Sequence, residues 1–251
     1  MNIAIITGAS SGLGTEYYKA IQNEELDEVW VIARREGALN EICQKYGKIK
    51  SRVIPLDLTL DESHEALLNI LNKEKPNIKY LFNNAGFGAY GKVDQIDISK
   101  QTNMIDLNIK ALTKITYYAL SFMSEGSKII NTSSIVAFSP IPNMAAYSAT
   151  KTYVMSFSRA LRHELRKRKI NVTAVCPGPM ATEFFAVAGV DGDKKSLINK
   201  MPYCNTEKVA KNGFKAAKRG KAVYTPRLLY KFLRLVGKAV PHTILIKFVS
   251  A

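Results

Sequence analysis

The sequence predicts an α/β fold with an open, doubly wound parallel sheet of about seven strands and helices on both faces. Short apolar runs rich in β-branched residues alternate with longer stretches of helical periodicity along most of the 251 residues. Such alternation is typical of parallel strands joined by right-handed helical crossovers. The runs are nearly continuous in apolar residues, as expected of strands that helices cover on both sides. A chain of this length is expected to form one large domain.

The expected strands are the apolar runs that turn residues bound. In chain order they are residues 3–7, 29–33, 52–56, 80–83, 128–132, 171–176 and 222–225. Helix-sized stretches lie between them, at residues 13–23, 37–46, 61–73, 101–123, 145–169 and 206–218. Residues 181–202 are the least regular part and are expected to be a long substrate loop with a short helix. Residues 1–225 would then form the domain, and residues 226–251 a basic helical extension of it.

Cysteine and histidine usage argues against a disulfide framework or a metal site. Cys43, Cys176 and Cys204 are odd in number and lack CxxC spacing, and the three histidines are scattered. A reducing cytoplasm is therefore the expected location. The apolar run at the N-terminus is too short for a signal peptide, and no later run approaches the ~20 residues of a membrane-spanning helix.

A glycine-rich segment follows the first strand and opens the first helix: Thr7-Gly8-Ala9-Ser10-Ser11-Gly12-Leu13-Gly14. A helix N-terminus presents free N–H groups and a partial positive charge to an anion. Glycines allow a tight turn and let a pyrophosphate approach the backbone. The spacing is G-x-x-x-G-x-G, and its place between a strand and a helix favours a dinucleotide site over an ordinary turn.

The second expected strand ends in two arginines, Arg34 and Arg35, where dinucleotide folds that bind NAD place a carboxylate for the ribose hydroxyls. A guanidinium suits a phosphate by its charge and its fork geometry. The predicted cofactor is therefore NADP(H). NAD(H) is the alternative, with the two arginines then solvated at a helix start.

A tyrosine and a lysine one helical turn apart, Tyr147 and Lys151, are the candidate proton-transfer pair. An ammonium beside a phenol favours the phenolate, so we expect the pKa of Tyr147 to lie below its usual value of ~10. Ser134, at the end of the fifth expected strand, would hold a carbonyl oxygen against the phenol. The same Tyr-x-x-x-Lys spacing recurs at Tyr46 and Lys50, so spacing alone does not identify the site.

Together these segments resemble the short-chain dehydrogenase/reductase family over roughly residues 3–182, which implies a Rossmann-like fold. The glycine pattern is similar to the family's dinucleotide loop, and Asp57-Leu58 resembles its adenine contact. Further matches, in chain order, are Asn83-Asn84-Ala85-Gly86 (the NNAG turn lining the cofactor), Asn108 in Asp-Leu-Asn-Ile, Asn131-Thr132-Ser133-Ser134, and Pro177-Gly178-Pro179-Met180-Ala181-Thr182 beside the nicotinamide. Only Tyr147 lies downstream of the strand that carries the serine, so the resemblance selects Tyr147 over Tyr46.

The resemblance also implies a mechanism in which the cofactor carries the hydride and the protein supplies orientation and the proton. Ser134 and Tyr147 would hydrogen-bond the substrate carbonyl oxygen, and Tyr147 would give up its proton. Lys151 would stabilise the tyrosinate and bind the nicotinamide ribose, and Asn108 would support re-protonation through a water. Both Tyr147 and Lys151 would thus contact the cofactor.

The expected function is an NADP(H)-dependent reductase or dehydrogenase acting on a ketone, aldehyde or secondary alcohol. Apolar residues flank the predicted site, which favours a lipophilic substrate, although they would serve equally as core: Phe138, Pro140, Ile141, Pro142, Met144, Phe184, Phe185 and Val187. A non-catalytic nucleotide-binding scaffold is one alternative, and an epimerase or dehydratase of the extended relatives is another. The resemblance further implies a homo-oligomer formed through the two long central helices.

Charge is unevenly distributed: the chain has 36 basic and 21 acidic residues, a net charge of +15, and no acidic residue follows Glu207. Four basic residues beyond residue 225 fall on one helical stripe, Arg227, Lys231, Arg234 and Lys238. Apolar residues occupy other parts of that helix, and residues 243–249 form a second apolar segment. Two interpretations are open: a helical pair packed on the core or over the substrate mouth, and a peripheral contact with an anionic membrane. Nucleic-acid binding is disfavoured because no recognition motif accompanies the charge.

Overall fold

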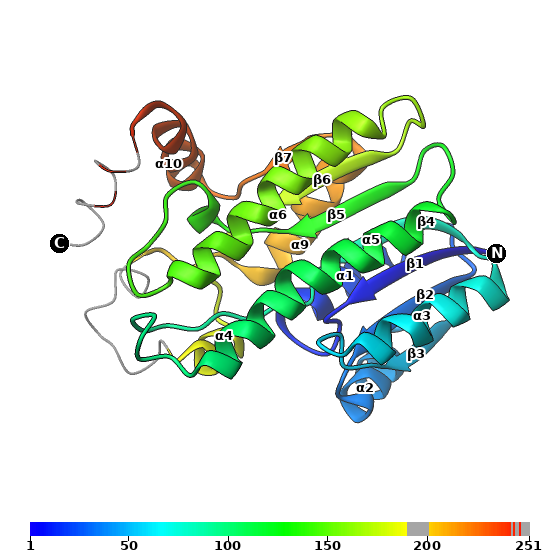
Figure 1. Ribbon diagram of the computed structural model, residues 1–251. Helices are drawn as coiled ribbons and strands as arrows, with labels where there is room; N and C mark the ends of the chain where they lie inside the picture. Colours follow the sequence, from blue (N-terminus) through cyan, green and yellow to red (C-terminus); the bar gives the residue numbers. More distant parts are fainter. Residues whose placement is uncertain (190–200, 242, 244–245, 247–251) are drawn as a thin grey trace.

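Seven strands form one parallel sheet in the order β3-β2-β1-β4-β5-β6-β7. The structure is a computed structural model that describes residues 1–189, 201–241, 243 and 246. The strands are β1 (Asn2–Thr7), β2 (Glu28–Ala33), β3 (Ser51–Pro55), β4 (Asn77–Asn83), β5 (Lys128–Thr132), β6 (Asn171–Val175) and β7 (Val223–Tyr224). The predicted doubly wound α/β sheet is confirmed (Figure 1).

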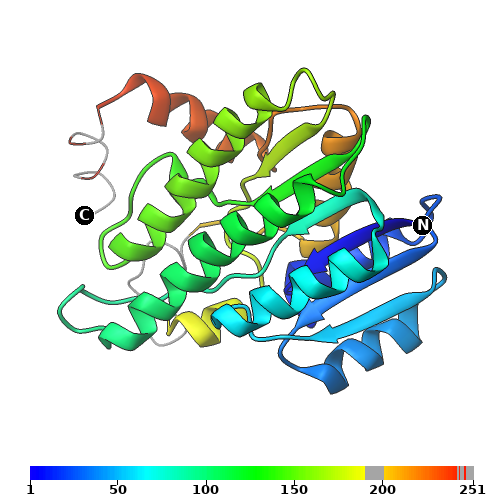
Figure 2. The ribbon, with the colours of Figure 1, turned by 45° about the vertical axis from the view of Figure 1, so that its right-hand side comes forward.

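Helices cover both faces of the sheet (Figures 1 and 2). One layer contains α1 (Gly12–Ile21), α2 (Glu36–Tyr46) and α9 (Thr206–Lys218), and the other contains α3 (Asp61–Glu74), α5 (Leu112–Leu120) and α6 (Ala145–Glu164). The remaining helical segments are α4 (Ile98–Ile105), the π-helical η1 (Asp106–Ala111), the 3-10 turn η2 (Ile135–Ala137), α7 (Phe184–Ala188) and α10 (Leu228–Ala239).

Strand β1 shows why these runs fold as central strands. Ala4 and Ile6 are fully buried against the first layer, and Ile3 and Ile5 are fully buried against the second. Side chains alternate between the two faces of a strand, so a strand that is covered on both faces must be apolar throughout. The continuous apolar runs of the sequence are thus the direct signature of the double layer.

The strand order reverses between β1 and β4, so the connections from these two neighbours run to opposite sides of the sheet. Ligands of open α/β sheets bind in the crevice that forms at such a point, outside the carboxyl ends of the strands. The turns that follow Thr7 and Asn83 meet there, and the fold therefore places the glycine-rich turn and the NNAG turn side by side.

One predicted helix is interrupted in the structure. The stretch 101–123 is not a continuous α-helix: α4 and α5 are separated by the π-helical turn η1. The helical spacing of the apolar residues continues through this turn, so the sequence pattern did not reveal the turn. A π-turn inserts an extra residue into the helix and is frequent at functional sites.

The C-terminal extension contains α10, which lies at the outside of the molecule beside η2 (Figure 1). Of the expected second apolar segment, only residues 243 and 246 are among the described residues. Residues 190–200 of the expected substrate loop also lie outside them. In the described part of the chain, no helix combines the length and apolar character needed to cross a bilayer.

Candidate active site

The turn between β1 and α1 depends on glycine at three positions. Gly8 and Gly12 have φ angles of +66° and +53°, which side-chain-bearing residues rarely adopt. A Cβ on Gly14 would lie 2.0 Å from the Gly8 carbonyl oxygen, so the helix packs directly on the turn. The first turn of α1 carries no acidic residue, and the N-cap Ser11 makes no side-chain capping hydrogen bond. Its N–H groups therefore face a crevice suited to an anion.

Thr7 ties this turn to the NNAG turn. Its Oγ1 donates to the Phe82 carbonyl at 3.2 Å and accepts from the N–H groups of Asn84 and Ala85 at 2.9 and 3.0 Å. The Asn84 amide donates to the Thr7 carbonyl at 3.2 Å and accepts from the Thr132 hydroxyl at the same distance. The carboxyl ends of β1, β4 and β5 are thereby fixed against one another.

The ends of β2 and β3 form the adjacent part of the crevice. Arg34 lies 3.8 Å from Asp57, and Arg35 forms a 2.9 Å ion pair with Glu183, 148 residues away in sequence. Asp57 also accepts hydrogen bonds from the backbone and hydroxyl of Thr59. The arginine side chains are 73 and 52% exposed, so a phosphate could reach both of them from solvent.

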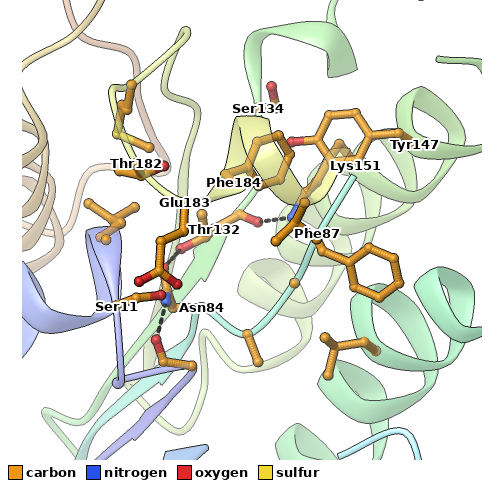
Figure 3. Close-up of a pocket in the computed structure, with 18 of the residues that line it drawn as sticks. Ser11, Asn84, Phe87, Thr132, Ser134, Tyr147, Lys151, Thr182, Glu183 and Phe184 are labelled. Carbon is orange, nitrogen blue, oxygen red and sulfur yellow. Dashed lines mark hydrogen bonds between the residues drawn. The ribbon is translucent and has the colours of Figure 1, made fainter. Parts of the chain in front are cut away.

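Ser134 caps η2 just after β5, and Tyr147 and Lys151 lie one turn apart on α6. All three are buried. The Lys151 ammonium donates to the Thr132 carbonyl at 3.0 Å, and the Ser133 hydroxyl donates to the Lys151 carbonyl at 2.8 Å. The Ser134 and Tyr147 hydroxyls share one side of the pocket, as Figure 3 shows, and the Lys151 ammonium is 5.7 Å from the phenol ring centroid.

The expected lowering of the tyrosine pKa was wrong for this arrangement. Burial raises the pKa of Tyr147 well above 10, and a hydrogen bond with Ser134 offsets only part of that rise. Burial also lowers the pKa of Lys151 from 10.5 to about 8. Desolvation disfavours the charged form of both groups and is the largest cause of both shifts. Burial therefore favours the neutral phenol of Tyr147.

Asn108 lies in the π-turn, immediately behind the NNAG turn, and does not line the pocket. Its side-chain oxygen accepts from the Phe87 N–H at 3.1 Å, and its amide donates to the Phe87 carbonyl at 2.9 Å and the Thr150 hydroxyl at 3.0 Å. A Cβ on Gly86 would lie 2.7 Å from the Asn108 oxygen and 3.4 Å from the Lys151 nitrogen. Asn108 thus cross-links the NNAG turn to α6, next to Lys151.

The glycine turn, the arginines and the Ser134–Tyr147–Lys151 cluster all line one pocket of about 560 Å³, within the usual range for a small-molecule site. The structure brings together nearly all predicted cofactor residues there: Gly8, Ser10, Ser11, Gly12, Leu13, Arg34, Arg35, Asp57, Leu58, Asn84, Ala85, Gly86, Tyr147, Lys151, Pro177, Gly178, Met180 and Thr182. Gly14 is the exception, because it packs beneath the turn.

The end of the pocket beside Tyr147 is apolar. The Phe184 ring lies 5.5 Å from the Tyr147 ring and packs so close to Gly88 that a Cβ there would lie 2.7 Å from it. Five of the eight apolar residues predicted near the substrate line the pocket: Ile141, Met144, Phe184, Phe185 and Val187. The other three, Phe138, Pro140 and Pro142, do not line it, and Phe138 instead packs in the core beside α10.

Several pocket residues escaped the sequence analysis, notably Phe87, Met201 and Glu183. Phe87 directly follows the NNAG turn and Glu183 directly follows the Pro177–Thr182 stretch, so extending each motif by one residue would have found both. Met201 carries no such signal. The described residues contain no group of three or more His, Cys, Asp or Glu side chains that could hold a metal ion.

The groups present fit a nicotinamide dinucleotide. The glycine-rich turn and the NNAG turn approach each other closely, because a Cβ on Gly8 would lie only 2.8 Å from Ala85. Backbone atoms of both turns therefore line this part of the pocket. The helix N-terminus and the arginines supply positive charge for phosphates at one end. The buried hydroxyls and ammonium at the other end supply the donors that a carbonyl and a ribose require.

Comparisons with known proteins agree with this arrangement. Residues 2–191 match the short chain dehydrogenase family. An uncharacterised oxidoreductase of Staphylococcus aureus (strain N315) is 30% identical over 195 residues, covering 77% of this chain and 84% of that protein. One from Staphylococcus epidermidis is 29% identical over 198 residues, covering 78 and 84%. A short-chain dehydrogenase from Sphingobium yanoikuyae in complex with NADPH has a TM-score of 0.82 at 26% identity, covering 95 and 94% of the two chains. The chain therefore belongs to the short chain dehydrogenase family of oxidoreductases.

Proposed function

We propose that the protein is an NADP(H)-dependent oxidoreductase that interconverts a ketone or aldehyde with the corresponding alcohol. The observation that carries this proposal is that Ser134, Tyr147 and Lys151 converge in the pocket that the glycine turn and the two arginines also line. Oxyanion donors and a phosphate cradle in one pocket are what a hydride transfer to a carbonyl requires.

In the reductive direction, the Ser134 and Tyr147 hydroxyls donate hydrogen bonds to the substrate carbonyl oxygen. The nicotinamide, when bound, supplies the hydride. Two donors aimed at an oxygen that becomes negative contribute on the order of 3 kcal/mol each. Tyr147 passes its proton to that oxygen, and the Lys151 ammonium stabilises the tyrosinate that remains. Lys151 would also bind the nicotinamide ribose, and Asn108 would hold the turn that faces it.

The neutral form of Tyr147 is the form that carbonyl reduction uses. Its raised pKa keeps Tyr147 protonated, as a proton donor must be, whereas alcohol oxidation requires the phenolate as base. Lys151, with a pKa of about 8, is largely charged at pH 7 and loses its charge as the pH rises through that value. We therefore expect carbonyl reduction to decline above about pH 8.

The preference for NADP(H) rests on Arg34 and Arg35 at the end of β2. A double substitution, Arg34→Asp with Arg35→Ala, should move the preference from NADPH toward NADH, because it replaces phosphate ligands by a carboxylate suited to ribose hydroxyls. The ratio of kcat/KM for NADPH and NADH measures the change. An unaltered ratio would refute the assignment. The NADPH bound to the Sphingobium relative supports the same choice.

A lipophilic substrate is proposed because apolar side chains surround the reacting hydroxyls. Phe184 covers one side of the Tyr147 ring, and Phe87, Ile141, Met144 and Val187 line the rest of this end. Burial of an apolar substituent there gains about 25 cal/mol per Å² of area removed from water. In a panel of carbonyl compounds, kcat/KM should rise with the apolar size of the substituents.

We also infer that the protein forms a homo-oligomer through the long helices α5 and α6. Tyr117 on α5 is 73% exposed, and Tyr153 on α6 is also exposed and stacks on Phe157 with ring centroids 5.7 Å apart. Large aromatic side chains are favoured at subunit interfaces. Light scattering after size-exclusion chromatography tests this, and a monomer at micromolar concentration would refute it.

The decisive experiment compares Tyr147→Phe with Tyr46→Phe, the matched control from the second Tyr-x-x-x-Lys pattern. NADPH absorbance follows turnover with the carbonyl panel, and a fluorescence titration follows NADPH binding. Loss of the proton donor should lower kcat by about 10² to 10⁴ and leave NADPH affinity nearly unchanged. Tyr46→Phe should retain full activity. Turnover of Tyr147→Phe within about tenfold of the parent would refute the mechanism, and NADPH binding without turnover of any carbonyl would indicate a non-catalytic scaffold.

A further inference from the structure

Helix α10 presents a row of apolar side chains to solvent. Leu228, Phe232 and Leu235 are 81, 62 and 63% exposed, and they lie within one sector of the helix. Single exposed apolar residues are common on protein surfaces, but a contiguous row on one helix face indicates an interaction site.

The opposite side of α10 fixes its orientation. Tyr230 is fully buried, its ring lies against Gly178 and its hydroxyl donates to the Pro202 carbonyl. Gly237 approaches Phe138 so closely that a Cβ would lie 2.4 Å from the Phe138 carbonyl oxygen. The side of α10 that belongs to the protein core is therefore already packed, and the apolar row lies on a different side of the helix.

Basic side chains border the apolar row on one flank. Arg227, Lys231 and Lys238 are exposed and follow one another along the helix. No acidic residue follows Glu207 in the sequence, so α10 carries no carboxylate that could neutralise them. An apolar face bordered by cations is the pattern of a helix that lies in the plane of an anionic membrane surface.

We propose that α10 docks the protein on an anionic lipid surface. Leu228, Phe232 and Leu235 enter the boundary between headgroups and acyl chains, and the basic flank meets the lipid phosphates. The helix is 12 residues long, far fewer than the ~20 residues that span a bilayer, so it lies on the surface. A second copy of the chain fits this face less well, because its own α10 carries no carboxylate that could meet the basic flank.

The docked helix adjoins the reaction pocket through one residue. The Tyr230 ring packs against Gly178, and Gly178 lines the pocket. Figure 1 shows α10 at the side of the molecule toward which the carboxyl ends of the strands point. Docking therefore holds the pocket close to the lipid surface. The docking itself does not depend on the reaction proposed above.

Co-sedimentation with extruded vesicles of phosphatidylcholine containing or lacking 30 mol% phosphatidylglycerol tests the proposal (a composition of about one anionic lipid in three). The full-length protein should sediment with the anionic vesicles at low salt and be released at high salt, as screening predicts. Each basic residue near an anionic surface contributes about fivefold in partitioning, so Lys231→Glu with Lys238→Glu should weaken binding by roughly 25-fold or more. Phe232→Ser with Leu235→Ser should weaken it as well, although no charge changes.

The matched control is Lys211→Glu with Lys215→Glu, two exposed positions on α9 that give the same change in net charge. This variant should keep most of the binding. Equal loss in both charge-reversal variants would overturn the proposal in favour of unspecific attraction by net charge, and so would absence of sedimentation at low salt. Conversion of an oligomer to a monomer by the Phe232–Leu235 substitution, measured by light scattering, would assign the face to a second copy instead. Retained NADPH binding checks that every variant is folded.

Discussion

Replacing Lys151 by methionine should stabilise the cofactor-free protein while abolishing its activity. Burial lowers the pKa of this lysine from 10.5 to about 8, which means that the folded state disfavours its charge. The difference of about 2.5 pH units corresponds to about 3 kcal/mol at 1.36 kcal/mol per unit. Methionine has a similar length and no charge, so it removes this penalty. It also removes the hydrogen bond to the Thr132 carbonyl, which offsets about 1 to 2 kcal/mol of the gain.

The expected net gain at pH 7 is therefore about 1 to 2 kcal/mol, or a rise in Tm of a few degrees for a chain of this size. The pH dependence provides the sharper test. Because the folded pKa lies below the unfolded one, the unfolded chain binds more protons between about pH 8 and 10.5, and the parent protein gains stability as the pH rises through this range. Below about pH 8 the full penalty is present. The advantage of Lys151→Met should accordingly shrink above about pH 8 and vanish between about pH 9 and 10, where the remaining penalty equals the contribution of the lost hydrogen bond.

Urea unfolding followed by circular dichroism between pH 7 and pH 10 measures this advantage, and subtraction of the parent curve cancels groups that both proteins share. Lys211→Met is the control, because that lysine is exposed on α9 and its substitution should leave the free energy of unfolding nearly constant. If Lys151→Met is less stable than the parent at every pH, or if the difference does not change with pH, the charge of Lys151 is not disfavoured in the folded protein and the reasoning fails.

Two further predictions concern the cofactor end of the pocket. Glu183→Gln should tighten NADPH binding by up to about fivefold, because the carboxylate competes with a phosphate for Arg35 and exposed ion pairs contribute up to about 1 kcal/mol. Fluorescence titration should show no matching change for NADH. Equal tightening of NADPH and NADH binding would contradict this role of Glu183. Gly14→Ala should destabilise the protein by several kcal/mol, because its Cβ would lie 2.0 Å from the Gly8 carbonyl oxygen, whereas Gly37→Ala, with nothing within 4 Å, should be neutral or slightly stabilising. Tolerance of both alanines in thermal unfolding would show that the turn adapts.

The strands could be predicted from the sequence because their apolar runs are also their burial pattern. β5 begins and ends at the predicted residues, and no start or end of another strand differs from its prediction by more than the three residues found at the start of β4. The π-turn at Asn108 could not be predicted, since the apolar residues on both sides of it keep a helical period. The Arg35–Glu183 ion pair joins residues 148 positions apart, and it forms only because the segment between β6 and α7 reaches the residues that follow β2.

The pKa of Tyr147 shows a different limit of sequence reasoning. The Tyr-x-x-x-Lys spacing correctly placed the lysine one turn away, and Coulomb attraction then predicts a lower tyrosine pKa. The size of the opposing desolvation depends on how many side chains of α7 and η2 cover the pair, and those segments are distant in sequence or irregular. The spacing of the two residues therefore gives the sign of the Coulomb contribution to the tyrosine pKa, whereas burial decides the direction of the total shift.

The two Tyr-x-x-x-Lys patterns of this chain differ both in the position of the lysine and in the burial of the tyrosine. Helix α2 ends at Tyr46, so Lys50 lies beyond the helix and pairs with Glu28 at 2.7 Å instead. Tyr46 is only partly buried, and the ammonium of Lys19 lies 4.2 Å from its ring centroid. A phenol that is in contact with water can exchange its proton with the solvent, without a buried partner beside it. Tyr147 differs because α6 continues past Lys151 and both side chains are buried where they line the pocket, so that in the proposed reduction the phenol would give its proton to a substrate bound there.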